Sequence, residues 1–173
     1  MLSNTKKRKR LIWVIDIVYA VVMLCFLFLR NSFDIGGSYW EHLAMNINVV
    51  PLNTIKQMVY LIVYGSNPYL IPYAVINLLG NIAGFVPLGL LLPATWEKLR
   101  TFKKTFFCAA LSILLVEVIQ LFTLRGSFDI DDLFLNLIGV AVGFLLRKVV
   151  LHENKIPDRC LVRQIELDEK ECD

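Results

Sequence analysis

Histidine, cysteine and catalytic motifs are scarce in this chain, and their scarcity excludes several classes of protein. The chain has only two histidines and four widely separated cysteines, so no spacing resembles a zinc site. Two cysteines fall in long apolar runs and two near the C-terminus, which gives no disulfide framework. No phosphate-loop motif and no Ser-His-Asp or Cys-His pattern is present. No metal and no cofactor are therefore expected.

What the chain has in abundance is apolar sequence. Hydrophobic residues make up 57% of its 173 residues, and its mean hydropathy is +0.60. A membrane-spanning helix needs about 20 mostly apolar residues. Four such runs are present, at 11–29, 70–92, 105–124 and 130–151. The sequence predicts an all-α, polytopic membrane protein with one four-span domain, residues 1–152, and a cytoplasmic tail, residues 153–173.

Lysine and arginine predict how the chain crosses the membrane. Basic residues cluster at Lys6–Arg10, between the second and third runs, and at the end of the fourth run, at Arg147 and Lys148. The two other connections carry few, so the positive-inside rule puts both termini in the cytoplasm. A signal peptide would begin in the same way, but no small-residue cleavage site follows the first run. The basic N-terminus is explained by topology, and no nucleic-acid partner is expected.

The first external connection, residues 31–69, is not a plain loop. It is rich in aromatic residues, which favour the lipid–water interface. Its apolar stretch at 55–65 is too short to span a membrane. We therefore expect one or two short interfacial helices in this segment, lying on the outer leaflet or packed over the bundle.

Polar side chains inside the last three spans are the strongest functional signal, because such residues are costly in lipid. A rise of about 1.5 Å per residue places all of them in the outer half of the membrane. Helical spacing puts Asp132, Asn136, Gly139 and Gly143 on one face, with Asp131 pointing away, so replacing Asp131 should be mild. The candidate cluster comprises Asn77, Asn81, Glu117, Gln120, Arg125, Asp129, Asp132 and Asn136.

Several of these residues have structural interpretations. Asparagine and glutamine in spans commonly serve only as hydrogen-bonding links between helices, which we favour for each amide taken alone. A buried acid needs a partner, and Arg125 is the expected partner of Glu117 or Asp129. Asp16 is interpreted as a paired or snorkelling acid outside the site. The patterns GNIAG and GVAVG predict close helix packing on the same faces. The whole set, on three helices at one depth, favours a pocket.

Three blocks of sequence follow one another in the order and spacing of a known family: NVVPLNTI, NLLGNIAGFVPLGLLLP and EVIQLFTLRGSFDIDDLFLNLIGVAVG. Over about residues 11–150 the chain resembles the VanZ-like family, although Leu52 stands where an aromatic residue is frequent. The resemblance implies a multi-pass protein of the bacterial cytoplasmic membrane. It also implies a link to resistance against teicoplanin, a glycopeptide that acts on cell-wall precursors. It implies no reaction.

Two functions from different classes remain open. The cluster could bind an envelope lipid, a lipid-linked cell-wall precursor or a lipoglycopeptide, with Arg125 holding a phosphate. Alternatively, the protein could be an intramembrane hydrolase or transferase acting on a lipid-linked envelope substrate. Glu117 would then be its acid or base, and Asp129 and Asp132 would position a nucleophile or a divalent ion. Binding is favoured because no nucleophile is evident. A transporter is a third alternative, although no repeat is visible. The sequence does not predict the oligomeric state.

Overall fold

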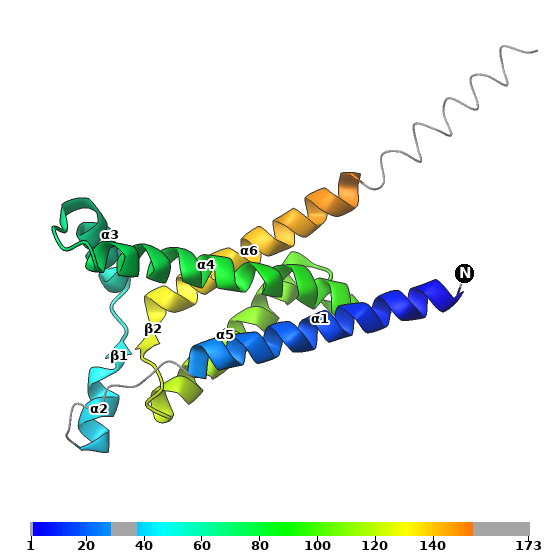
Figure 1. Ribbon diagram of the computed structural model, residues 1–173. Helices are drawn as coiled ribbons and strands as arrows, with labels where there is room; N and C mark the ends of the chain where they lie inside the picture. Colours follow the sequence, from blue (N-terminus) through cyan, green and yellow to red (C-terminus); the bar gives the residue numbers. More distant parts are fainter. Residues whose placement is uncertain (1, 29–37, 154–173) are drawn as a thin grey trace, which may run out of the picture.

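The chain folds as a bundle of long helices (Figure 1). The computed structural model describes residues 2–28 and 38–153. Four helices are long and apolar enough to cross a membrane: α1 (Leu2–Phe28), α4 (Leu70–Thr95), α5 (Phe102–Phe122) and α6 (Ile130–Glu153). The predicted all-α polytopic membrane protein with four spans is therefore confirmed. Beyond Glu153, the expected tail lies outside the described residues, so the domain boundary stays a prediction.

Shorter elements connect the long helices. The segment between α1 and α4 contains α2 (Tyr39–Met45), β1 (Ile47–Asn48) and α3 (Asn53–Tyr64). The turn η1 (Glu97–Leu99) joins α4 to α5, and β2 (Phe128–Asp129) precedes α6. The two short helices confirm the expectation of short helices in residues 31–69, and their position at the membrane interface stays a prediction. The parallel pairing of β1 with β2, with Ile47 opposite Phe128, was not predicted. A two-residue strand shows no periodicity, so the sequence carries no signal for it.

The direction of each helix brings one set of ends together (Figure 1). Helices α4 and α6 begin, and α1 and α5 end, at the end of the bundle that carries β2, called the β2 end below. The turn η1 lies at the opposite end, called the η1 end. Helix α6 is therefore parallel to α4 and antiparallel to α5.

Helices α4 and α6 make the most extensive helix–helix contact, and glycine permits it. A Cβ atom added to Gly139 would lie 2.1 Å from the carbonyl oxygen of Ile82, and one added to Gly143 would lie 2.0 Å from that of Val86. The predicted GVAVG contact on α6 is therefore confirmed. The GNIAG prediction on α4 is wrong, because a Cβ on Gly80 would meet nothing within 4 Å and one on Gly84 would meet Met23 of α1.

Helix α1 lies at the periphery of the bundle. None of the residues in the most apolar part of its span is buried within the protein. It is held by individual polar contacts: the Tyr19 hydroxyl donates to the carbonyl oxygen of Gly84 at 2.9 Å, and Thr95 donates to the Asp16 carboxylate. Asp16 is thus a paired acid, as expected, and it lies outside the candidate site.

The glycine contacts predict a contrast between two conservative substitutions. Gly143→Ala should lower the thermal aggregation midpoint of the detergent-solubilised protein, because its Cβ would overlap the backbone of α4. The matched control is Gly80→Ala, which meets open space and gains helix propensity of about 1 kcal/mol. Its midpoint should equal or exceed that of the parent. Equal midpoints for the two variants would contradict the close α4–α6 crossing.

Candidate functional site

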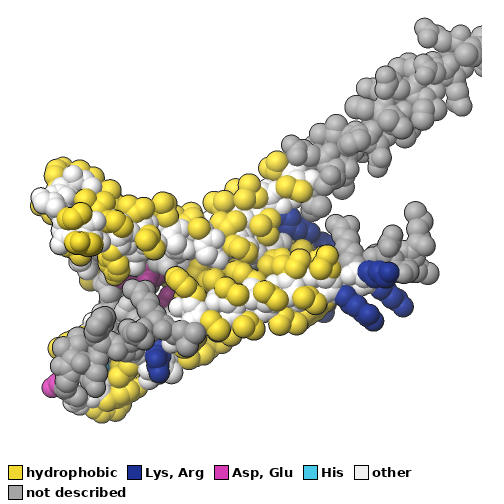
Figure 2. Space-filling model, in the orientation of Figure 1, with side chains coloured by type: hydrophobic (Ala, Val, Ile, Leu, Met, Phe, Trp, Pro, Cys, Tyr) yellow, Lys and Arg dark blue, Asp and Glu magenta, His cyan; other side chains and the backbone are white. Residues whose placement is uncertain are grey.

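The polar residues of the three inner spans gather at the β2 end, where they meet the segment that runs from β1 into α3. Figure 2 shows acidic side chains in a recess between the lobe that carries α3 and the lobe that carries α2. The residues come from α4, α5, β2, α6 and residues 48–55. We call this group the polar cluster; its members are Asn48, Thr54, Asn77, Asn81, Glu117, Asp129, Asp131, Asp132 and Asn136.

Hydrogen bonds to the Asp129 carboxylate link the segment around β1 to the start of α6. One carboxylate oxygen accepts hydrogen bonds from the Thr54 hydroxyl at 2.5 Å and from the Asn48 amide nitrogen at 3.2 Å. The other accepts the backbone N–H of Asp131 at 2.9 Å, an interaction typical of a helix N-cap. Asn48 and Thr54 were not predicted as site residues. Their only signal was their place in the block NVVPLNTI.

Asp131 lies in the first turn of α6, and its side chain also caps the start of α3. Its carboxylate accepts the backbone N–H of Leu52 at 2.6 Å and that of Ile55 at 3.1 Å. These amides lie at the start of α3, where backbone donors have no partner within the helix and a negative charge is favourable. The side chain does turn away from the Asp132 face, but it is completely buried. These contacts lead us to expect a loss of stability on replacement, in contrast to the mild effect expected from the sequence.

Asp132 and Glu117 form the acidic part of the cluster that faces α4 and α5. The amide nitrogen of Asn81 donates to Asp132 at 2.6 Å, linking α4 to α6. The Glu117 carboxylate accepts from the backbone N–H of Asp129, and it lies close enough to the Asp132 and Asp129 carboxylates for charge repulsion. Glu117 is only 7% exposed, so this repulsion acts in a poorly solvated place.

Arg125 does not join the cluster. It is exposed, and in residues 2–28 and 38–153 it forms no ion pair with Glu117 or Asp129, so the predicted pairing is wrong. It belongs to the turn that ends α5, where Leu124 has φ 52° and the Arg125 N–H donates to the Gln120 carbonyl oxygen at 3.0 Å. A guanidinium that stays in water avoids the cost of desolvation that burial would impose.

Gln120 has a structural role at the edge of the cluster. Its side-chain amide donates to the carbonyl oxygen of Leu27 at 2.9 Å, in the last turn of α1. Carbonyl groups at a helix C-terminus lack partners within the helix, so this contact ties α1 to α5. The interpretation of Gln120 as a link between helices fits this contact.

Two asparagines lack the partners that a structural role would require. The side-chain oxygens of Asn77 and Asn136 are buried and accept no hydrogen bond. Asn136 is only 3% exposed and lies one helical turn from Asp132. More than about 90% of buried polar groups in proteins have a partner, and an unsatisfied one costs about 1–3 kcal/mol. These two oxygens therefore keep an unused capacity to accept a hydrogen bond.

The comparisons with known proteins are consistent with the predicted family. A family model described as VanZ/LLP1 matches residues 16–151, a range that includes every member of the polar cluster. No curated protein and no solved structure matches the chain. Among the described residues, no group of three or more His, Cys, Asp or Glu side chains is arranged to hold a metal ion.

The position of Asp131 predicts a loss of stability. Asp131→Ala leaves two backbone donors at the start of α3 without an acceptor, at a cost of about 1–3 kcal/mol for each. Asp131→Asn keeps one oxygen and should fall between Ala and the parent. Thermal aggregation midpoints in detergent measure both. The neighbouring variant Asp132→Asn, which keeps an acceptor for Asn81, is the control. An Asp131→Ala midpoint equal to that of the parent would rule out this anchoring role.

Proposed function

Because the chain belongs to the VanZ/LLP1 family, we propose that it is a bacterial cytoplasmic-membrane protein whose polar cluster binds an envelope ligand. The ligand is an envelope lipid, a lipid-linked cell-wall precursor or a glycopeptide-type molecule. Binding at the outer leaflet would change how much of the antibiotic or of its target is free there. Through this effect the protein would contribute to resistance against glycopeptides such as teicoplanin.

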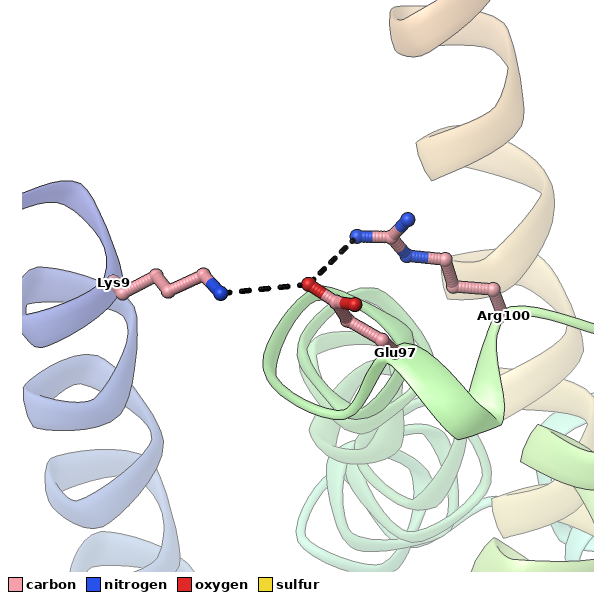
Figure 3. A network of polar contacts seen from close by, with 3 residues as sticks. All are labelled: Lys9, Glu97 and Arg100. Atoms are coloured by element: carbon pink, nitrogen blue, oxygen red, sulfur yellow. Dashed lines mark hydrogen bonds and ion pairs between the residues drawn. The ribbon is translucent and has the colours of Figure 1, made fainter. Parts of the chain in front are cut away.

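The proposal requires the β2 end to face outward and the η1 end to face the cytoplasm. The distribution of basic residues supports this orientation. At the η1 end, the ammonium of Lys9 lies 3.4 Å from the Glu97 carboxylate and the guanidinium of Arg100 lies 3.6 Å from it (Figure 3). Exposed Lys98 lies in the same connection between α4 and α5, and exposed Lys103 and Lys104 lie in the first turn of α5. Basic residues favour the cytoplasmic side of a membrane.

The observation that carries the binding proposal is the unpartnered oxygen of Asn136. It is buried one helical turn from Asp132, and among the buried side-chain atoms described only the Asn77 oxygen shares its lack of a partner. A leucine of similar size would avoid the cost of an unsatisfied acceptor. A bound molecule that donates a hydrogen bond gives the asparagine a physical reason to be there.

One observation favours the enzyme alternative. Glu117 and Asp132 place two carboxylates close together in a poorly solvated site, and such pairs can divide the roles of acid and base. An intramembrane hydrolase or transferase would then act on a lipid-linked envelope substrate. Turnover of envelope lipids by the purified protein, measured as a function of pH, separates this alternative from binding.

The binding proposal predicts that function and stability respond in opposite ways to Asn136→Leu. This variant removes an acceptor that has no partner, so its thermal midpoint should equal or exceed that of the parent. Protection against teicoplanin in an expressing host should nevertheless be lost. Glu97→Gln, at the η1 end, should retain protection. Minimum inhibitory concentrations, corrected for the amount of protein in the membrane, provide the measurement. Full protection by Asn136→Leu would contradict the proposal.

The proposed orientation predicts which single cysteines react from outside. Ser38, Ser127 and Thr101 are all exposed on the protein, so each tolerates a labelling probe. In a background without Cys25, Cys108, Cys160 and Cys172, an impermeant thiol reagent added to intact protoplasts should label cysteine at positions 38 and 127. Position 101, beside η1, should react only after lysis. Labelling of position 101 in intact protoplasts would reverse the assignment.

A further inference from the structure

We propose that the η1 end carries a second binding surface, which takes the headgroup of an anionic phospholipid of the surrounding membrane. Figure 2 shows Lys and Arg side chains gathered at this end. We call the surface the basic patch; its members are Arg100, Lys103, Lys104, Arg147 and Lys148. This inference goes beyond the proposed function, because the patch lies at the end opposite the polar cluster and shares no residue with it.

Aromatic contacts bring together the two segments that form the basic patch. Phe102, in the first turn of α5, packs edge-on against Phe144 of α6, with ring centroids 5.4 Å apart. The ammonium of Lys148 lies 5.5 Å from the centroid of the same Phe144 ring, a distance typical of a cation–π contact. Basic residues that are far apart in the sequence therefore share one surface, at the start of α5 and the end of α6.

Two arginines of the basic patch oppose each other. The guanidinium groups of Arg100 and Arg147 lie close enough for charge repulsion, and arginine keeps its charge in proteins. Arg147 is half-buried, and neither of the ion pairs found among the described residues includes it. Arg100 contacts Glu97, but this exposed carboxylate is shared with Lys9, and such surface pairs contribute little. A phosphate can accept paired hydrogen bonds from a guanidinium, so its charge would relieve the repulsion.

Membrane topology explains the number of basic residues at the η1 end but not the position of these two arginines. Exposed lysines such as Lys98, Lys103 and Lys104 satisfy the positive-inside rule without approaching another cation. The rule gives no reason to bring Arg100 against Arg147 or to withdraw one of them partly from water, which costs free energy. An anion bound at the basic patch supplies that reason.

The position of the basic patch favours a lipid headgroup over a soluble anion. Trp13 and Trp96 pack together at the η1 end, with ring centroids 5.2 Å apart, and both are exposed. Exposed tryptophans favour the lipid–water boundary, and Arg100 follows Trp96 in the same connection. Arg147 lies in the last turns of a candidate span, directly after exposed apolar residues of α6. Basic groups at this level between membrane helices are suited to anionic headgroups.

Competition between two lipids tests the inference on the full-length protein in nanodiscs. Phosphatidylglycerol and phosphatidylcholine share a phosphate and differ in net charge. Either lipid is given brominated chains, which quench nearby tryptophans, and Trp40→Phe restricts the signal to Trp13 and Trp96. Phosphatidylglycerol should be preferred about fivefold or more, the effect of about one basic residue at a membrane surface. Both leaflets have the same composition, so the result depends neither on orientation nor on the proposed function.

Matched variants separate a defined site from diffuse attraction. Arg100→Gln combined with Arg147→Gln should abolish the preference, and Arg100→Gln alone, at an exposed position, should lower it by about half or more. Lys6→Gln combined with Lys7→Gln removes the same charge from exposed residues of the same end and should retain most of it. Thermal midpoints in detergent check that each variant is folded.

Three outcomes would overturn the inference. The first is equal quenching by the two lipids in the parent protein. The second is an equal loss of preference in the lysine and arginine variants, which would indicate diffuse attraction to the membrane. The third is a preference that appears only after the acids of residues 154–173 are replaced by amides, which would identify this segment as the occupant of the basic patch.

Discussion

The hydrogen bonds that Asp129 and Asp131 accept from residues 48–55 hold the β2 end together. In lipid, a backbone donor without a partner has no water to bind, so an irregular segment must find its acceptors within the protein. Asp131 supplies them for the first turn of α3, and Asp129 supplies them for Asn48 and Thr54. The same contacts hold Leu52 at φ 63°, a conformation that costs a residue other than glycine about 1–2 kcal/mol. Together with the β1–β2 pair, they fix α3 against the start of α6.

The crossing of α4 and α6 determines how the rest of the cluster is arranged. Gly139 and Gly143 bring the two backbones into contact at Ile82 and Val86. From this contact the helices diverge toward the β2 end (Figure 1). The divergence makes room for polar side chains while keeping Asn81 within hydrogen-bonding distance of Asp132. Close packing near the middle of the spans and an open polar end are thus two consequences of the same pair of glycines.

Much of this arrangement could be predicted from the sequence. Hydropathy indicates which segments span the membrane, and helical spacing indicates which residues share one face of a helix. The polar faces of α4 and α6 follow from helical spacing, but the hydrogen bond between Asn81 and Asp132 was not predicted. The roles of Asn48, Thr54 and Asp131 could not be predicted, because they depend on an irregular segment that folds back over α6. Helical spacing correctly predicts that Asp131 and Asp132 point to different sides of α6. It gives no information about which segment packs against the Asp131 side. Arg125 was misassigned because an argument from charge pairing ignored the cost of removing a guanidinium from water.

The three aspartates around the start of α6, Asp129, Asp131 and Asp132, therefore do not share one role. Asp129 and Asp131 bind protein donors, so replacing either would remove function by removing structure, whatever the site does. Asp132 and Glu117 are ambiguous for a related reason, since each also contacts a group of the protein. The asparagines differ. Because the oxygen of Asn136 accepts no hydrogen bond within the protein, its removal breaks none. A loss of function at an unchanged thermal midpoint therefore points to a contact made outside the chain, which makes this neutral residue more informative about the ligand than its charged neighbours.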